Sequence, residues 1–320
     1  MRNWYRDKRK TWLLRGVTAL CAVTLVVSCA MLIRYWLDAR HTQALQEEAA
    51  RSYHEAQASE EAARAARTEA PTPSPVPTET DSPAEATAAP TSAPTDDGRV
   101  TAVSYPNGIY TIASPVFSAL RQSNIDVMGW LTVEGLVDAP VVLRDNTYYL
   151  DHGIDRAKNV NGALFLDEST VFEAGKRPST FIIFGHNMKT GEMFGQLKKY
   201  LTFSWYAEHP LITFNSVYED GTYIVFAAAT IRVEESVAGQ ADYVDVYDLY
   251  SERRAARQAV ADTLRDLTPY TTRVSVDGND QILLLVTCNG VDDERVVVAA
   301  RRLRDGEDAE KLRLSLGSTS

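Results

Sequence analysis

The chain has 320 residues, 24% of them charged, and a formal net charge of −10 at pH 7. This acidic balance excludes the basic surface with which nucleic-acid-binding proteins neutralise phosphates. The length allows one or two domains. Of the three cysteines, only Cys288 lies outside an apolar N-terminal segment. The rest of the chain therefore cannot form an internal disulfide.

The N-terminal segment predicts a membrane anchor. Residues 16–33 carry no charge, and as a helix they span about 27 Å, close to the ~30 Å hydrocarbon core. Residues 1–15 carry six basic side chains against one acidic one, so the remaining chain has a net charge of −15. The positive-inside rule then predicts a cytoplasmic basic tail at 1–15, a transmembrane signal-anchor at 16–36, and the rest of the chain outside the cell membrane.

A cleaved signal peptide is the alternative for this segment. Arg34, Tyr35 and Trp36 follow the apolar run, where a cleavage site requires small residues. Under either interpretation the bulk of the protein is exported.

Residues 37–99 are predicted to form a stalk and a linker. Residues 38–69 are rich in Ala, Glu, Gln and Arg and lack Gly and Pro, which favours a helix, interpreted as a solvated stalk. Its His41 and His54 require no role. Residues 70–97 contain seven of the thirteen prolines, which predicts a disordered tether. As polyproline II it reaches up to about 85 Å and holds a domain well off the bilayer.

Residues 100–320 are predicted to be one mainly β domain. Short apolar runs rich in β-branched and aromatic residues alternate with turn residues, and eight such strands suggest a closed or nearly closed barrel with flanking helices. The expected strands are Ala139–Leu143, Gly162–Leu166, Thr180–Phe184, Leu211–Phe214, Thr222–Thr230, Arg273–Val276, Ile282–Thr287 and Arg295–Ala300. The expected helices are Ser114–Ser123 and a long one at Leu249–Leu267, before the cysteine strand, with Ser251 as its N-cap.

Cys288 is the candidate nucleophile. It ends an apolar run and precedes Asn289-Gly290, so it lies at a strand end, where a side chain reaches substrate. The alternative is a buried thiol that packs as a small apolar group. His186 ends another apolar run about a hundred residues upstream, and a histidine partner favours nucleophilic catalysis. His152 and His209 lack such a pattern and are interpreted as local loop residues.

Arg295 is the third candidate catalytic residue. It opens an apolar run seven residues after Cys288, so on an antiparallel neighbouring strand it points back toward the thiol. Its fixed charge then holds substrate carbonyls or a developing oxyanion. The alternative is a salt bridge to Asp292, Asp293 or Glu294. No closely spaced His or Cys ligand set and no glycine-rich phosphate loop is present, so neither a metal nor another cofactor is expected.

The domain resembles the class B sortases over nearly its whole length. The resemblance rests on a set of motifs: Asn124-Ile-Asp126-Val-Met-Gly129-Trp130-Leu131, Ala139-Pro140-Val141-Val142, Asp145-Asn146-Thr147-Tyr148-Tyr149-Leu150, Asn161-Gly162-Ala163-Leu164-Phe165-Leu166-Asp167, Gly185-His186-Asn187-Met188-Lys189-Thr190-Gly191-Glu192-Met193-Phe194-Gly195-Gln196-Leu197, Val286-Thr287-Cys288 and Arg295-Val-Val-Val298. Phe184 departs from the family, in which a tyrosine is common before the glycine.

The resemblance implies an eight-stranded sortase barrel and a cysteine transpeptidase without a cofactor. Cys288 attacks the Thr carbonyl of a C-terminal sorting motif in a secreted protein, His186 protonates the departing amine, and Arg295 stabilises the oxyanion. A peptidoglycan stem or crossbridge amine then resolves the thioester. Thr287 is a candidate oxyanion donor, and Thr287 and Asn187 are candidate substrate-binding residues.

Several alternatives stay open at this point. The acceptor is a pilin lysine if the enzyme polymerises pili, or water if it is a cysteine peptidase. An L,D-transpeptidase requires a Ser-x-Gly-Cys segment, which is absent. A tethered adhesin or scaffold gives no reason for the placement of His186 and Arg295.

Overall fold

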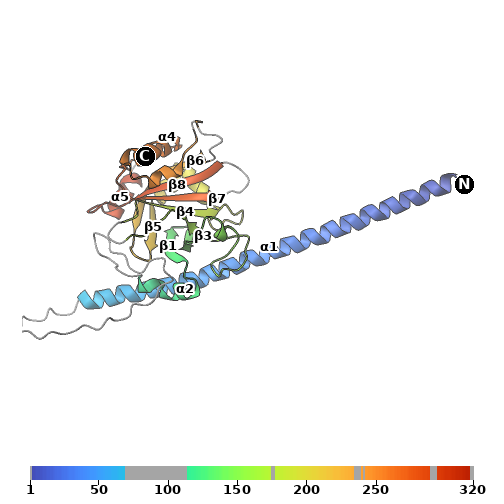
Figure 1. Ribbon diagram of the computed structural model, residues 1–320, viewed down its shortest axis with the longest axis horizontal. Coiled ribbons are helices and arrows are strands. Elements are labelled where there is room, and N and C mark those ends of the chain that lie inside the picture. The colour runs from blue at the N-terminus through green and yellow to red at the C-terminus, as the bar shows by residue number, and fades with distance from the viewer. Residues whose placement is uncertain are drawn as a thin grey trace, which may run out of the picture.

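The computed structural model describes residues 2–68, 114–173, 177–233, 239–240, 242–288 and 294–317. Within this part of the chain, eight strands close a barrel in the order β1-β2-β3-β4-β7-β8-β6-β5. One long helix, α1, runs beneath the barrel, and its N-terminal half projects away from it (Figure 1). The predicted mainly β barrel with flanking helices is confirmed.

The barrel and its helices have the following bounds. The strands are β1 (Val127–Val133), β2 (Val137–Val142), β3 (Leu164–Leu166), β4 (Thr180–His186), β5 (Leu211–Ser216), β6 (Thr222–Arg232), β7 (Ile282–Cys288) and β8 (Glu294–Arg302). The α-helices are α1 (Arg2–Thr68), α2 (Ser118–Ser123), α3 (Phe203–Glu208), α4 (Arg254–Leu267) and α5 (Ala309–Gly317). Single 3₁₀ turns are η1 (Pro115–Phe117), η2 (Tyr148–Leu150), η3 (Leu197–Leu201) and η5 (Val246–Tyr250).

One predicted strand is wrong and one observed strand was not predicted. Arg273–Val276 is an extended segment outside the barrel, to which Arg301 attaches it by donating a 2.7 Å hydrogen bond to the Ser275 carbonyl. β1 takes its place in the barrel. The central Gly129 of β1 weakens a strand prediction, yet the glycine is needed, because a Cβ there would lie 2.5 Å from the Phe214 ring on β5.

The long helix before the cysteine strand is confirmed, but it begins later than predicted. α4 starts at Arg254 and is preceded by η5. Ser251 is not its N-cap: the cap position is Arg253, whose backbone N–H donates to the Ser251 hydroxyl at 3.2 Å. The buried side of α4 packs on β6 (Figure 1).

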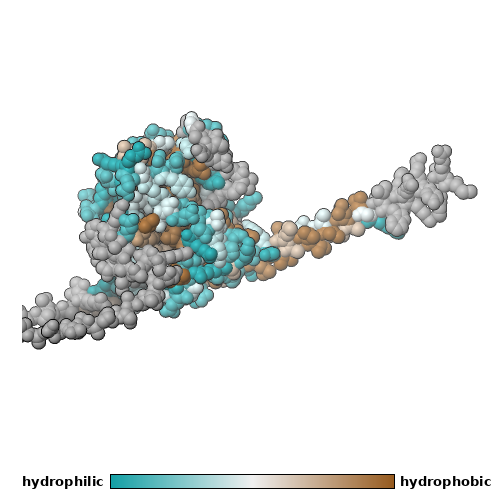
Figure 2. Space-filling model, in the orientation of Figure 1, coloured by the Kyte–Doolittle hydropathy of each residue, from teal (hydrophilic) through white to brown (hydrophobic). Residues whose placement is uncertain are grey.

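The N-terminal half of α1 is the one stretch of the described chain that is long and apolar enough to cross a membrane. Its apolar window has a mean hydropathy of 2.4 and none of it is buried. Figure 2 shows the part of α1 that projects from the barrel as mostly brown, with paler residues between the apolar ones. This helix is compatible with a single-pass membrane anchor.

The C-terminal half of α1 packs on the barrel, so the prediction of a solvated stalk is wrong. Ala39, Thr42, Ala49 and Tyr53 are all buried, and they recur on one side of the helix. Small residues at 39 and 49 let the helix approach closely. Thr42, Ala49 and Tyr53 follow one another at seven and four residues, a helical spacing that brings all three to the barrel.

Tyr53 is the largest buried side chain in the described part of α1. Its ring stacks on Trp130 of β1 with a centroid distance of 4.3 Å and an interplanar angle of 5°. Its hydroxyl accepts a 2.9 Å hydrogen bond from Asn215 of β5. The two histidines of this segment also have partners, since His41 pairs with Asp155 at 2.9 Å and His54 with Asp138 at 2.8 Å.

The docking of α1 changes the role of the proline-rich segment. Burial on α1 begins with Ala39, two residues beyond the exposed apolar Leu37. The helix therefore connects the apolar segment directly to the barrel, and residues 69–113 join the far end of α1 to η1 and α2. The predicted tether thus does not separate the domain from the apolar segment. Its predicted disorder falls on residues 70–97, outside the described residues.

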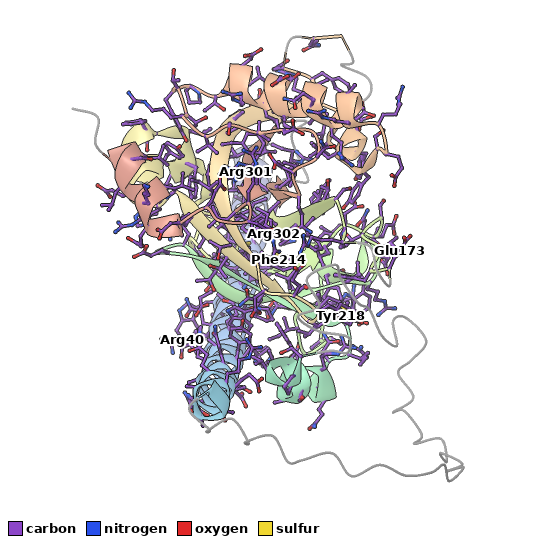
Figure 3. The ribbon with its side chains drawn as sticks, turned by 90° about the vertical axis from the view of Figure 1, so that its left-hand side faces the viewer. Arg40, Glu173, Phe214, Tyr218, Arg301 and Arg302 are labelled. Atoms are coloured by element: carbon purple, nitrogen blue, oxygen red, sulfur yellow. The ribbon has the colours of Figure 1, made fainter. Side chains whose placement is uncertain are left out.

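An ion pair stabilises the opposite side of the barrel. Arg301 of β8 is only 2% exposed and donates to both carboxylate oxygens of Glu307 at 2.6 and 2.8 Å. These bonds lower the pKa of Glu307 below its usual range. Figure 3 shows Arg301 and Arg302 on the barrel, well apart from Arg40 on α1.

We expect Tyr53→Ala to lower the free energy of unfolding by about 3 kcal/mol, because it removes a buried aromatic side chain and orphans the Asn215 amide. Urea unfolding of the full chain in detergent, followed by tryptophan fluorescence, measures this change. Tyr247→Ala is the control, since Tyr247 is 49% exposed, and should cost less than about 1 kcal/mol. Equal stabilities for the two variants would contradict the docking of α1.

Candidate active site

Strand pairing brings the predicted nucleophile and its histidine together. β4 and β7 are parallel neighbours, paired from Thr180 with Ile282 through to His186 with Cys288. Both strands end at this pair, so two residues distant in sequence are cross-strand partners at the same edge of the barrel. The backbone of Cys288 is described, whereas its thiol and residues 289–293 lie outside the described part of the chain.

Arg295 approaches the same edge from the other side of Cys288. β7 and β8 are antiparallel, with Val286 paired to Val297, and two further steps of this register place Arg295 opposite Cys288. Residues paired across strands project from the same face of a sheet. His186, Cys288 and Arg295 therefore occupy neighbouring positions on one face, as the predicted catalytic arrangement requires.

Arg295 is a half-buried residue, and its Nη1 donates a 2.9 Å hydrogen bond to the backbone carbonyl of Glu294. The Glu294 carboxylate pairs instead with Arg232 on β6 at 3.2 Å. Asp292 and Asp293, the other two carboxylates of the ion-pair alternative, lie outside the described residues. Of the three carboxylates considered as salt-bridge partners of Arg295, only that of Glu294 is described, and it pairs with Arg232.

A backbone carbonyl orients the imidazole of His186. Its Nε2 lies 2.6 Å from the carbonyl oxygen of Leu150. A carbonyl oxygen only accepts, so Nε2 carries the hydrogen of this bond. Nδ1 is then the ring nitrogen with which a neutral His186 accepts a proton.

A buried polar network supports the segment that presents Leu150. Asn124 donates to the Tyr149 hydroxyl at 2.9 Å and to the Ile154 carbonyl at 2.8 Å. Tyr149 in turn donates to Asp126 at 2.8 Å, and burial raises the pKa of Tyr149 to about 12, so it remains a donor. Asn124, Asp126 and Tyr149 belong to the motifs of the sequence resemblance, and their hydrogen bonds support the loop that orients His186.

Two glycines allow the chain to pass close to His186. Gly162 has a φ of +59°, and a Cβ there would meet the Tyr149 carbonyl oxygen and lie 3.2 Å from Cδ2 of His186. At Gly185 a Cβ would lie 2.5 Å from Leu164 and 2.7 Å from the Phe194 ring. The sequence analysis assigned no role to Leu150 or Gly162. A glycine at position 162, within one of the quoted motifs, was the signal that could have indicated a close approach of the backbone.

The two predicted substrate-binding residues differ in setting. Thr287 is 3% exposed, and its hydroxyl accepts a 3.0 Å hydrogen bond from the backbone N–H of Val296 on β8. Asn187, the residue after His186, is exposed and forms an isolated antiparallel β-bridge with Met193. The roles of Thr287 and Asn187 in substrate binding stay predictions.

α1 also contacts the loops around His186. Asn159 and Asn161 donate to the Thr42 hydroxyl at 2.7 and 3.1 Å. The Gln46 amide lies 3.7 Å from the sulfur of Met193, in the loop that follows β4. The helix that begins as the apolar segment thus forms one wall beside the candidate active site.

Comparisons with known proteins identify the family. A model of the sortase domain matches residues 132–303, so the chain belongs to the sortase family. Its curated relatives are sortase B proteins: that of Listeria monocytogenes is 32% identical over 177 residues (53% of this chain, 65% of that protein), and that of Staphylococcus aureus is 26% identical over 195 residues (59% of this chain, 75% of that protein). The chain thus spans slightly less than two thirds of the Listeria protein.

A solved structure from Bacillus anthracis, described as similar to sortase B, has the same fold. Its TM-score is 0.56 at 22% identity, with 82% of this chain and 96% of that chain covered. Together with the curated relatives, this likeness confirms the predicted resemblance to class B.

We expect Gly162→Ala to lower the rate of peptide cleavage about 100-fold, because an added Cβ displaces the loop that orients His186. Gly306→Ala is the matched control: Gly306 also has a positive φ, +82°, but nothing lies within 4 Å of its Cβ position. Steady-state cleavage assays at matched folded fraction should show nearly normal activity for the control. Equal activities of the two variants would contradict the role given to the loop.

Proposed function

We propose that this protein is a cysteine transpeptidase that cleaves a C-terminal sorting motif of secreted proteins after threonine and transfers the acyl group to an amine. Membership of the sortase family supports the reaction class. The observation that carries the assignment of residues is the strand register, which pairs His186 with Cys288 and continues to Arg295.

In the first half-reaction the Cys288 thiolate attacks the threonine carbonyl carbon. The electron pair of the carbonyl bond moves to oxygen, and the tetrahedral intermediate then collapses with breakage of the C–N bond. His186 gives the leaving amine its proton from Nδ1, since Nε2 is held by the Leu150 carbonyl. The product is a thioester on Cys288.

Arg295 stabilises the negative charge that develops on the carbonyl oxygen. A guanidinium presents several N–H donors in a fixed plane and keeps its charge at every working pH. It therefore favours the oxyanion over the neutral carbonyl of the bound peptide, which lowers the barrier to attack.

In the second half-reaction an amine attacks the thioester carbonyl, loses its proton to His186, and releases the Cys288 thiolate. We propose a peptidoglycan stem or crossbridge amine as the acceptor. A pilin lysine, which would make the protein a pilus polymerase, and water, which would make it a peptidase, use the same three residues.

We also propose that residues 16–36 cross the cell membrane with the N-terminus in the cytoplasm and the barrel outside. The exposed apolar half of α1 and the basic residues before it support this orientation. The buried part of α1 begins at Ala39, directly after the proposed membrane span. The barrel therefore lies close to the extracellular face of the cell membrane.

We expect Cys288→Ala to abolish the covalent acyl-enzyme while the far-UV circular dichroism and melting temperature remain normal. Incubation with a pentapeptide library, followed by intact-mass spectrometry, detects the thioester and identifies the captured sequence. Turnover by Cys288→Ala would overturn the assignment of the nucleophile.

We expect Arg295→Lys to lower kcat/KM about 100-fold or more, because a point charge replaces a planar set of donors. The control is Arg313→Lys on α5, whose guanidinium is exposed and pairs only with Glu310 among the described residues. Steady-state kinetics on the captured peptide measure both. Full activity of Arg295→Lys would show that the guanidinium plane is not required.

A further inference from the structure

The hydroxyl of Thr42 joins α1 to the chain that surrounds His186. Thr42 is 4% exposed, and its hydroxyl donates to the Asp38 carbonyl at 3.0 Å, within α1. A hydroxyl has one hydrogen and two lone pairs. In its contacts with the amide nitrogens of Asn159 and Asn161, at 2.7 and 3.1 Å, Thr42 is therefore the acceptor. One donor and two acceptor positions are thus all in use.

The two asparagines belong to a tight turn at 159–162. The Asn159 carbonyl accepts from the Gly162 N–H at 3.0 Å, and Oδ1 of Asn159 accepts from the Asn161 N–H at 2.9 Å. Both side chains are buried. The Asn161 amide also has Glu192 as an acceptor, at 3.5 Å. The amide of Asn159 is therefore the group that depends most on Thr42.

This turn abuts the imidazole and the carbonyl that orients it. The Cβ position of Gly162 lies 3.2 Å from Cδ2 of His186 and 3.0 Å from the Leu150 carbonyl oxygen, the same oxygen that lies 2.6 Å from Nε2 of His186. The Ala163 N–H donates to the Tyr149 carbonyl at 3.0 Å. A shift of the turn therefore moves the acceptor that holds the ring.

One turn further along, α1 contacts the loop on the other side of His186. The Gln46 amide lies 3.7 Å from the sulfur of Met193, and Met193 forms an isolated β-bridge with Asn187. Thr42 and Gln46 thus place one turn of α1 against both loops that flank the histidine.

Other contacts of α1 lie far from His186 and provide a comparison. Tyr53 lies eleven residues beyond Thr42, about 17 Å along the helix. Its hydroxyl also accepts from a buried barrel amide, that of Asn215 on β5. The two hydroxyls make the same kind of bond to the barrel, but only that of Thr42 leads to the 159–162 turn.

We propose that Thr42 is a positioning residue for the transpeptidase reaction. Its hydroxyl fixes the 159–162 turn, the turn fixes the Leu150 carbonyl, and the carbonyl fixes the imidazole of His186. The inference rests on the proposed function. It makes α1 a part of the catalytic unit in addition to its proposed role as the membrane anchor.

A pair of matched substitutions tests this role. Thr42→Val keeps the branched shape of the side chain but removes the hydroxyl, so the Asn159 amide loses its acceptor. Thr42→Ser restores the hydroxyl without the methyl group. Tyr53→Phe is the control, because it also removes an α1 hydroxyl that accepts from a buried amide.

Full-length protein in detergent is mixed with excess captured sorting peptide, and intact-mass spectrometry of quenched samples gives the rate of acyl-enzyme formation. We expect Thr42→Val to lower the rate at saturating peptide about 10-fold, because the imidazole is misplaced. The peptide concentration that gives half the maximal rate should not change. Thr42→Ser should recover most of the rate, and Tyr53→Phe should leave it nearly normal.

The imidazole itself provides a readout that a loss of stability in folded protein does not change. In nitrogen-15 spectra of the neutral ring of His186, we expect wild type and Tyr53→Phe to show the tautomer with hydrogen on Nε2. Thr42→Val should show a mixture of both tautomers. Thr42→Ala provides the same comparison if the valine variant does not fold.

Two results would overturn the positioning role. One is a normal rate and a single ring tautomer in folded Thr42→Val. The other is an equal loss of rate in Thr42→Val and Tyr53→Phe, which would mean that Thr42 contributes only to docking. A wild-type protein that forms no acyl-enzyme would instead refute the proposed function, and the ring spectra would still decide whether Thr42 positions His186.

Discussion

The structure depends on one pairing, that of β4 with β7. Parallel neighbours end at the same edge of a sheet, and here both strands end at the pair His186 and Cys288. Parallel strands require long connections, which explains why the two residues are about a hundred positions apart in the sequence. The chain between them returns through β5, β6 and α4, and the antiparallel β8 brings Arg295 to the same edge.

Pairing alone leaves the imidazole free to rotate, and the loop before β3 removes that freedom. The Leu150 carbonyl binds Nε2 of His186, and the loop is anchored by the network of Asn124, Asp126 and Tyr149. Its other side contacts α1 through Asn159, Asn161 and Thr42. The apolar helix and the orientation of the histidine are thus linked by a continuous set of hydrogen-bonded groups.

The catalytic candidates and the barrel were predictable because strong local signals mark them. Apolar runs that end in Cys288 and His186 indicate strand ends, and the motifs of the family indicate the barrel. β1 was not predicted because Gly129 interrupts its β-forming residues. The contacts that require this glycine, with the Phe214 ring and the Asn215 carbonyl, come from β5, which is distant in sequence. Arg273–Val276 has strand-like residues, but its Ser275 carbonyl accepts a hydrogen bond from the Arg301 side chain and the segment joins no strand of the barrel.

The docking of α1 was not predictable from composition, which is polar over residues 38–69. Its buried face is narrow, consisting of small residues and one tyrosine, and its partners Trp130, Asn159 and Asn215 are distant in sequence. Only tertiary contacts distinguish such a face from a solvated helix.

The imidazole of His186 is the most direct test of this account. Nitrogen-15 NMR of the selectively labelled protein, at a pH where the ring is neutral, assigns the tautomer. We expect a hydrogen on Nε2, with a coupling across the hydrogen bond to the Leu150 carbonyl. A hydrogen on Nδ1 and a bare Nε2 would contradict it, because the Leu150 carbonyl would then have no donor to accept from and proton transfer would have to use the other nitrogen.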